Sequence, residues 1–128
     1  MKPSRSPLVA LVASFGYAFA GIVHAARTQR NFRIHIAITS LVILLGTWLR
    51  LSAERWAILV LTIGVVFQAE LVNTALEAIV DKVSPEFHPL AKIAKDCVAG
   101  AVLVLAVAAV IVGGLVMGPR LIERLGDF

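Results

Sequence analysis

The sequence predicts an all-α membrane protein, in which an N-terminal amphipathic surface helix precedes three transmembrane helices. Hydrophobic residues make up 59% of the 128 residues, and the mean hydropathy is +0.91, whereas an ordinary soluble domain is about 45–50% apolar. Apolar runs alternate with charged segments, and no segment has the period-two pattern of a half-buried strand. We expect a single domain over 1–128, with transmembrane helices at about 32–50, 55–81 and 94–118.

The three apolar runs differ in length and purity. Ile34–Leu49 has 16 residues, which is short for a bilayer core of about 30 Å, but the arginines on either side can extend to the lipid headgroups. The run that begins at Trp56 is long enough, although carboxylates occupy its second half. Cys97–Gly118 contains 22 residues without a charge and is the clearest spanning signal. Glycines near its end predict close helix packing: Gly113, Gly114 and Gly118.

Residues 7–27 have a different pattern. Bulky side chains repeat along one helical side, at positions 8, 11, 12, 15, 19, 22 and 23, and the opposite side is small or polar. This pattern predicts an amphipathic helix at the membrane surface. The alternative is a secretory signal peptide, with Lys2 and Arg5 as its basic region and "AFAG" as its cleavage site.

The basic residues indicate membrane topology and not a nucleic-acid partner, because they flank the apolar runs. The net charge is +4, from 12 basic and 8 acidic residues. The positive-inside rule places the N-terminus and the second connection in the cytoplasm, because more basic residues lie on that side. The cytoplasmic group is Lys2, Arg5, Arg27, Arg30, Arg33, Lys82, Lys92 and Lys95, and the opposite group is Arg50, Arg55, Arg120 and Arg124. The single cysteine, Cys97, excludes an intrachain disulfide.

The stretch "AELVNTALEAIVDK", residues 69–82, places polar side chains on one side of the second transmembrane helix. At about 100° per residue, Glu70, Asn73, Glu77 and Asp81 fall within an arc of roughly 100°. A solvated helix end would explain Asp81. It does not explain Glu70, which lies about 16 Å deeper, where an unpaired carboxylate is costly. We therefore expect Glu70 to be functional.

These residue types are those of phosphoryl transfer to a membrane lipid. Hard oxygen ligands on Glu77 and Asn73 favour Mg²⁺. Lys95 can hold a phosphate, and Asp96 can orient that lysine or a second ligand. A buried Glu70 suits the removal of a proton from an alcohol, and an alcohol at that depth belongs to a lipid. The sequence has no Walker A motif, GxGxxG loop or HRD-type motif of the soluble kinases.

Two other classes of protein fit part of this pattern. A proton- or ion-translocating membrane assembly also uses intramembrane carboxylates, but the first and third transmembrane helices lack polar positions to continue a path. A structural scaffold leaves the polar stripe unexplained. Because three spanning helices cannot enclose a polar site alone, we also expect a homo-oligomer.

Four segments resemble the blocks of one family, in the same order and over about residues 14–112: "SFGYAFAGI", "RNFRIHI", "ELVNTALEAIVD" and "HPLAKIAKDCVAGAVL". The pattern E-x-x-N-[ST]-A-x-E-x-x-V-D followed by A-K-D is similar to that of the small prokaryotic integral-membrane lipid kinases, diacylglycerol kinase and undecaprenol kinase. "NFRIHI" and "HPLAK" look more like the undecaprenol branch. The resemblance implies a homotrimer with shared sites in the plasma membrane of a prokaryote, ATP as phosphate donor and Mg²⁺ as cofactor.

The resemblance also implies roles for single residues. Glu70 matches the catalytic base, with Asn73 as a polar residue of the site, and Glu77 matches a carboxylate that binds the metal of Mg-ATP. The other matches are positions that contact or lie near the nucleotide: Tyr17, Asp81, Glu86, Lys95 and Asp96. His88 matches a family histidine.

One position departs from the family pattern. The family often has a glutamate, a second metal ligand, where this chain has Gln29. An amide oxygen can still coordinate Mg²⁺ but carries no charge, so we expect weaker metal affinity, with a lost or altered activity as the alternative. His24 and His35 have no partner at metal-ligand spacing, and we assign neither a role.

Overall fold

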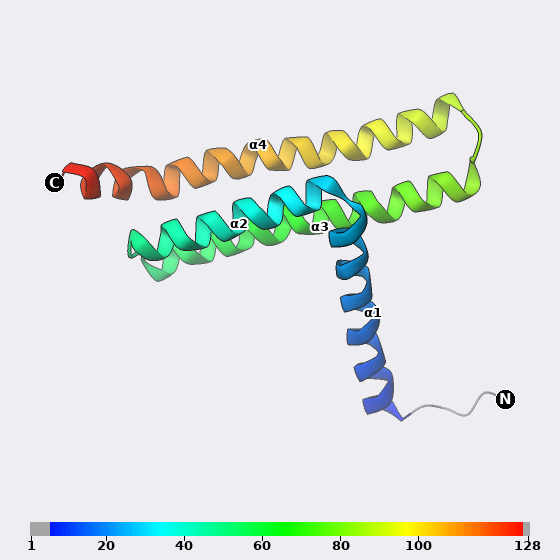
Figure 1. Ribbon diagram of the computed structural model, residues 1–128, viewed down its shortest axis with the longest axis horizontal. Coiled ribbons are helices and arrows are strands. Elements are labelled where there is room, and N and C mark those ends of the chain that lie inside the picture. Colours follow the sequence, from blue (N-terminus) through cyan, green and yellow to red (C-terminus); the bar gives the residue numbers. More distant parts are fainter. Residues whose placement is uncertain (1–5, 127–128) are drawn as a thin grey trace.

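The computed structural model describes residues 6–126, which form four α-helices: α1 (Pro7–Thr28), α2 (Arg30–Trp48), α3 (Ala53–Val83) and α4 (Pro89–Gly126). The axes of α2, α3 and α4 run roughly alongside one another, and α1 projects sideways from the start of α2 (Figure 1). The expectation of an all-helical chain is confirmed. Each of the four helices is long and apolar enough to cross a membrane. Lys2 and Arg5 lie outside the described residues.

Gln29 separates α1 from α2. α1 begins with Pro7, whose missing N–H is not needed in the first turn, and the Ser6 hydroxyl accepts a hydrogen bond from the Val9 N–H at 3.4 Å. At Gln29 the backbone is extended, with φ −99° and ψ 118°, so the helix stops and the chain changes direction. This break turns α1 away from the other helices and leaves the Gln29 side chain against α3.

A tight turn joins α2 to α3 as antiparallel neighbours. Arg50 adopts the left-handed conformation, with φ 52°, and the Leu51 N–H donates to the Gly46 carbonyl at 3.2 Å, as in a Schellman-type helix end. Gly46 permits a close approach here, because a Cβ at this position would lie 2.9 Å from the Trp56 ring. The turn and this contact together set the register between α2 and α3.

The core is a small apolar cluster at the end of the bundle that holds this turn. Its buried members are Leu49, Leu51, Leu59 and Val116. Arg55 links α3 to α4, because its Nη1 donates to the Val116 carbonyl at 3.2 Å. α4 extends beyond the predicted 94–118 at both ends and contains Pro119, although a proline inside a helix removes a backbone hydrogen bond.

The glycines of α4 do not pack closely within the chain. A Cβ added at Gly114 or Gly118 would meet nothing within 4 Å, and one at Gly113 would meet only Met117 of the same helix, at 3.6 Å. Within one copy of residues 6–126, these three positions therefore make no close contact with another helix. The small residues border a cavity instead.

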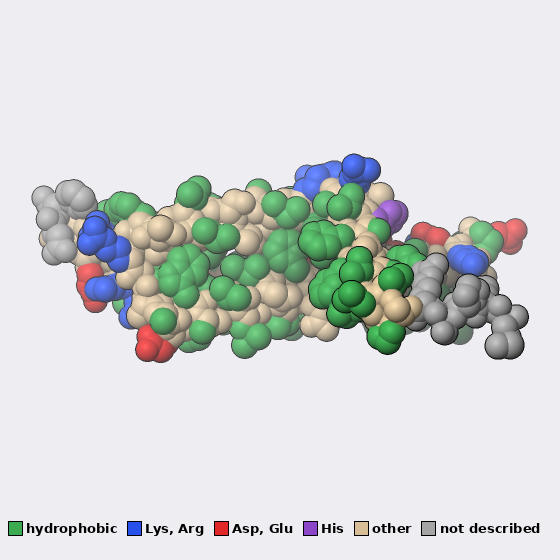
Figure 2. Space-filling model, turned by 90° about the horizontal axis from the view of Figure 1, so that it is seen from below, with side chains coloured by type: hydrophobic (Ala, Val, Ile, Leu, Met, Phe, Trp, Pro, Cys, Tyr) green, Lys and Arg blue, Asp and Glu red, His purple; other side chains and the backbone are tan. Residues whose placement is uncertain are grey.

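The exterior is apolar between charged ends. In Figure 2, charged side chains lie near the two ends of the molecule and close to the junction of α1 with α2, with apolar side chains between them. The α2–α3 turn and the end of α4 lie at one end of the bundle, and the α3–α4 connection lies at the other (Figure 1). Large apolar side chains on all four helices are exposed, as expected for helices that face lipid.

Candidate active site

One face of α3 carries the polar residues that the spacing predicts. Glu70 is 1% exposed, and Asn73 and Thr74 are each 8% exposed. Two turns further along the helix Glu77 is half-buried, and Asp81 is exposed. The face therefore runs from a fully buried carboxylate to a solvated one.

Glu70 contacts His35 of α2. Its Oε1 lies 3.2 Å from His35 Nε2, and the two side chains are 2% and 17% exposed. This contact is not a hydrogen bond, and the buried Oε1 has no hydrogen-bond partner among residues 6–126. The sequence alone gives His35 no role, whereas the structure places its ring against Glu70. A signal was present: His35 is the only ionisable residue in the first apolar run, as Glu70 is in the stretch 56–76.

A second cluster forms around Glu77. Asn73 Nδ2 donates to Glu77 Oε1 at 3.2 Å, and Gln29 Nε2 donates to Glu77 Oε2 at 3.5 Å. Gln29 lies at the break between α1 and α2. Because the chain changes direction there, its side-chain amide lies against α3. The structure therefore brings together the three residues that the sequence indicates for the metal, Gln29, Asn73 and Glu77.

The oxygen atoms of this cluster are suitable ligands for a magnesium ion that is bound together with a nucleotide. Among residues 6–126, no three His, Cys, Asp or Glu side chains gather to hold a metal ion. The cluster does offer one carboxylate and two amides, and Asn73 Oδ1 is buried without a hydrogen-bond partner. Mg²⁺ is commonly bound by one or two carboxylates together with substrate phosphates. A half-turn of the Gln29 amide would present its oxygen in place of its nitrogen.

Two ion pairs lie at the charged end beyond this cluster. Lys95 of α4 donates to Asp81 of α3, which ties the two helices together near their connection. Lys92 donates to Asp96 one turn later on the same helix. The possibility that Asp96 orients Lys95 is therefore wrong for this structure, because Asp96 pairs with Lys92.

A cavity of about 350 Å³ opens beside the Asp81–Lys95 pair. Glu86 and His88 also line this cavity. Three of the predicted nucleotide-binding residues therefore lie around it: Asp81, Glu86 and Lys95. Tyr17 does not join them. It is 72% exposed on α1, and twelve residues of helix, about 18 Å, separate it from Gln29.

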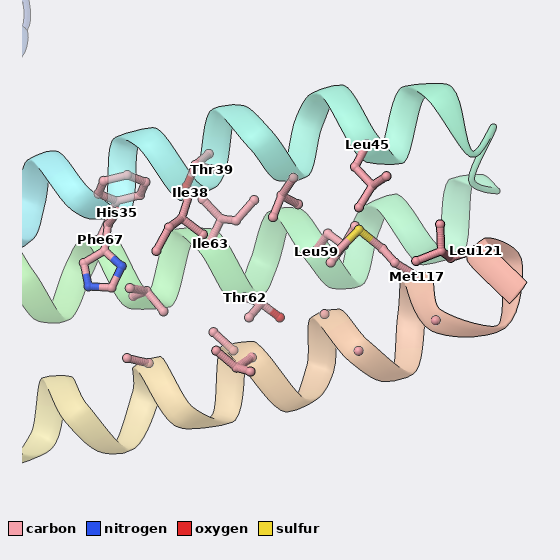
Figure 3. Close-up of a pocket in the computed structure, with 18 residues that line it drawn as sticks. His35, Ile38, Thr39, Leu45, Leu59, Thr62, Ile63, Phe67, Met117 and Leu121 are labelled. Carbon is pink, nitrogen blue, oxygen red and sulfur yellow. The ribbon is translucent and has the colours of Figure 1, made fainter. Parts of the chain in front are cut away.

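A larger cavity of about 400 Å³ lies between α2, α3 and α4. Figure 3 shows His35 and Phe67 at one end and Leu45, Met117 and Leu121 toward the other. Its walls are apolar except for His35 and two threonines, and α4 contributes mainly small residues. Periodicity did not predict this cavity. It extends into the apolar part of the bundle from the side chain that contacts Glu70.

Comparison with known proteins decides the family. A family model described as "Prokaryotic diacylglycerol kinase" matches residues 16–117. The chain belongs to this family. It is 53% identical over 116 residues to a diacylglycerol kinase of Synechocystis, an alignment that covers 90% of this chain and 66% of that relative. It is 45% identical over 120 residues to the undecaprenol kinase of Bacillus subtilis, covering 94% and 98%. It is 31% identical over 111 residues to the diacylglycerol kinase of Escherichia coli K12, covering 87% and 91%.

Membership in this family confirms two expectations. The relatives are named as lipid kinases, which agrees with the class of enzyme that the polar stripe and the resemblance indicate. The four apolar helices and these membrane relatives support a multi-pass membrane protein. The proton- or ion-translocating alternative is not favoured.

Proposed function

We propose that the chain is an ATP-dependent kinase that phosphorylates the hydroxyl of a membrane lipid, undecaprenol or diacylglycerol, at the cytoplasmic face. One observation carries the proposal: the buried carboxylate of Glu70 contacts His35, and His35 lines an apolar cavity within the bundle. A hydroxyl on a long hydrocarbon chain can reach such a place from the membrane. The two alcohols are those in the names of the relatives.

On the lipid side, the cavity between α2, α3 and α4 offers room for part of one hydrocarbon chain. Its lining contains three glycines of α4, at which an added Cβ would meet at most one neighbouring side chain. An apolar chain in this space would exchange lipid contacts for protein contacts of the same kind. In this proposal the polar end of the cavity, at His35, sets the depth of the hydroxyl.

On the nucleotide side, the charged end of α3 and α4 supplies the groups. Glu77 lies seven residues beyond Glu70, about 10 Å along the helix, and would bind the metal of Mg-ATP with Asn73 and Gln29. Mg²⁺, when bound, would neutralise charge on the phosphates. The residues proposed to contact the rest of the nucleotide are Asp81, Glu86, Lys95 and Asp96.

The transfer itself needs a base and a positive charge near the phosphates. Glu70 would accept the proton of the lipid hydroxyl, and the lipid oxygen would bond to the γ-phosphorus as the bond to the ADP oxygen breaks. Lys95, held by Asp81, would stabilise the charge on the leaving phosphates.

The proposal includes the assembly and its orientation. The N-terminus and the α3–α4 connection would face the cytoplasm, in accord with the distribution of basic residues. α1 would lie along the membrane surface, which its sideways projection supports (Figure 1). In a homotrimer with shared sites, Tyr17, which is exposed on α1, would contact a nucleotide bound to a neighbouring subunit.

The test is phosphate transfer from labelled ATP to lipid. Purified full-length protein in mixed micelles is given undecaprenol and diacylglycerol in parallel, with and without Mg²⁺. We expect labelled lipid phosphate from at least one alcohol, dependent on Mg²⁺, and a loss of at least about 100-fold in kcat for Glu70→Gln, as expected when a general base is removed. Glu123→Gln, at the opposite end of the bundle, is the matched control and should transfer at the wild-type rate. Equal transfer by Glu70→Gln and the wild type would remove Glu70 as the base.

A further inference from the structure

His35 lies between the candidate base and the apolar cavity. Its Nε2 is 3.2 Å from Glu70 Oε1, and the same ring forms the end of the cavity lining (Figure 3). Among the described residues that line this cavity, His35 is the only one with an ionisable side chain. A lipid hydroxyl that approached Glu70 from the cavity would therefore meet this ring.

Within residues 6–126, His35 is the one basic side chain that contacts the Glu70 carboxylate. Oε1 is buried and has no hydrogen-bond partner among residues 6–126, which is costly for a carboxylate oxygen. The hydroxyl of Thr74 is close in sequence but donates to the Glu70 backbone carbonyl, at 2.8 Å. Within the described chain, no Lys or Arg forms an ion pair with Glu70. A small rotation of the imidazole would align Nε2–H with Oε1.

An aromatic contact joins the two helices that carry His35 and Glu70. Phe32 and Phe67 lie one helical turn before His35 and Glu70 in their respective helices, and their ring centroids are 5.0 Å apart. Phe32 is buried. This contact packs α2 against α3 at the level of the pair, so the backbones that carry His35 and Glu70 lie next to each other.

We propose that His35 is a positioning residue for Glu70, which donates a hydrogen bond from Nε2 to Oε1 and thereby directs the second carboxylate oxygen toward the lipid hydroxyl. The inference rests on the proposed kinase function. In the reaction the lipid O–H bond breaks, and the proton moves to Glu70. The lipid oxygen bonds to the γ-phosphorus, and the bond from that phosphorus to the ADP oxygen breaks. His35 acts only through the direction in which Glu70 accepts the proton.

A double-mutant cycle of His35→Ala and Glu70→Gln tests this role. The kcat for lipid phosphorylation and the KM values for Mg-ATP and lipid are measured on the purified full chain. We expect His35→Ala to lower kcat by about 10- to 100-fold, the effect of one hydrogen bond to a charged group, without changing the KM for Mg-ATP. His35→Gln keeps an N–H donor and should recover most of the loss. In the Glu70→Gln background His35→Ala should cost nothing further, because no carboxylate remains to be positioned.

His24→Ala is the matched control, because His24 is an exposed histidine on α1, and it should retain the wild-type kcat. The proposal is overturned if His35→Ala keeps its kcat, if the losses of the two single variants add, or if glutamine at position 35 is no better than alanine. Thermal unfolding of the wild type, the two single variants and the double variant tests the contact between His35 and Glu70 independently of activity. Non-additive shifts of Tm support it, and additive shifts overturn it, even if the wild type transfers no phosphate and the proposed function itself fails.

Discussion

The Gln29 amide and the Glu77 carboxylate lie side by side, with Nε2 3.5 Å from Oε2, although 48 residues separate them in the chain. Their meeting depends on the extended backbone at Gln29, which ends α1 and starts α2. Asn73 approaches the other oxygen of the same carboxylate. The cluster therefore holds one negative charge between two amides, and its affinity for a cation is limited by that single charge.

Gln29→Glu should strengthen magnesium binding. A second carboxylate at this place adds a charged oxygen ligand, so we expect the Mg²⁺ concentration for half-maximal activity to fall by about tenfold, which corresponds to about 1.4 kcal/mol. Without Mg²⁺ the two carboxylates would repel each other, and Tm should fall below that of the wild type. Added Mg²⁺ should reverse this difference. Titration of activity and of Tm with Mg²⁺ measures both effects.

Asn31→Asp is the control for Gln29→Glu, because it adds the same charge at an exposed position two residues away. It should leave the Mg²⁺ dependence of Tm unchanged. If Gln29→Glu behaved like Asn31→Asp in both titrations, Gln29 would not belong to the metal site.

Lys95→Met should impair nucleotide binding with little effect on stability. The Asp81–Lys95 ion pair is exposed, and exposed pairs contribute only about 0–1 kcal/mol. A lysine that contacts phosphate contributes more, so we expect the KM for Mg-ATP to rise by about tenfold or more while Tm changes by a few degrees at most. Lys82→Met removes an exposed lysine of the same end and should leave the KM unchanged. An unchanged KM in Lys95→Met would place the nucleotide elsewhere.

Gly46→Leu should destabilise the fold. A Cβ alone would lie 2.9 Å from the Trp56 ring and 3.2 Å from Leu51, so the larger side chain must push α2 from α3. Overpacking of this kind costs about 1–3 kcal/mol. Gly64→Leu is the matched control, since a Cβ there meets nothing within 4 Å. Thermal unfolding in detergent compares the two variants. Equal Tm values would show that α2 and α3 adjust to the larger side chain without a loss of stability.

The polar face of α3 can be predicted from the sequence, because helical periodicity alone decides that Glu70, Asn73 and Glu77 share a side. Apolar run length likewise predicts the three long helices α2, α3 and α4, although α1 is also apolar enough to cross a membrane. The pairing of His35 with Glu70 cannot be predicted in this way. It depends on the register of two helices, which the turn at Arg50 and the approach of Gly46 to Trp56 determine.

The same limit explains two further differences between expectation and structure. Lys95 and Asp96 are adjacent in sequence, but neighbours on a helix point to different sides, and each finds its partner elsewhere. A run of small residues on α4 is compatible with a close helix contact or with a cavity, and only the positions of α2 and α3 decide between them. Local patterns thus indicate which side chains share a face, and three-dimensional packing decides what that face meets.

Gly114→Leu should fill part of the cavity between α2, α3 and α4 and compete with the lipid. A Cβ at Gly114 meets nothing within 4 Å, so a leucine there can be accommodated without displacing a helix, and Tm should not fall. If the cavity holds a hydrocarbon chain, the KM for the lipid should rise by about tenfold, which corresponds to about 1.4 kcal/mol of lost apolar contact, and the KM for Mg-ATP should not change. Gly100→Leu makes the same substitution on the same helix outside the cavity lining and should leave both KM values unchanged. A lower Tm and a changed oligomeric state in Gly114→Leu, with an unaltered KM for lipid, would instead mean that a second copy of the chain fills this space.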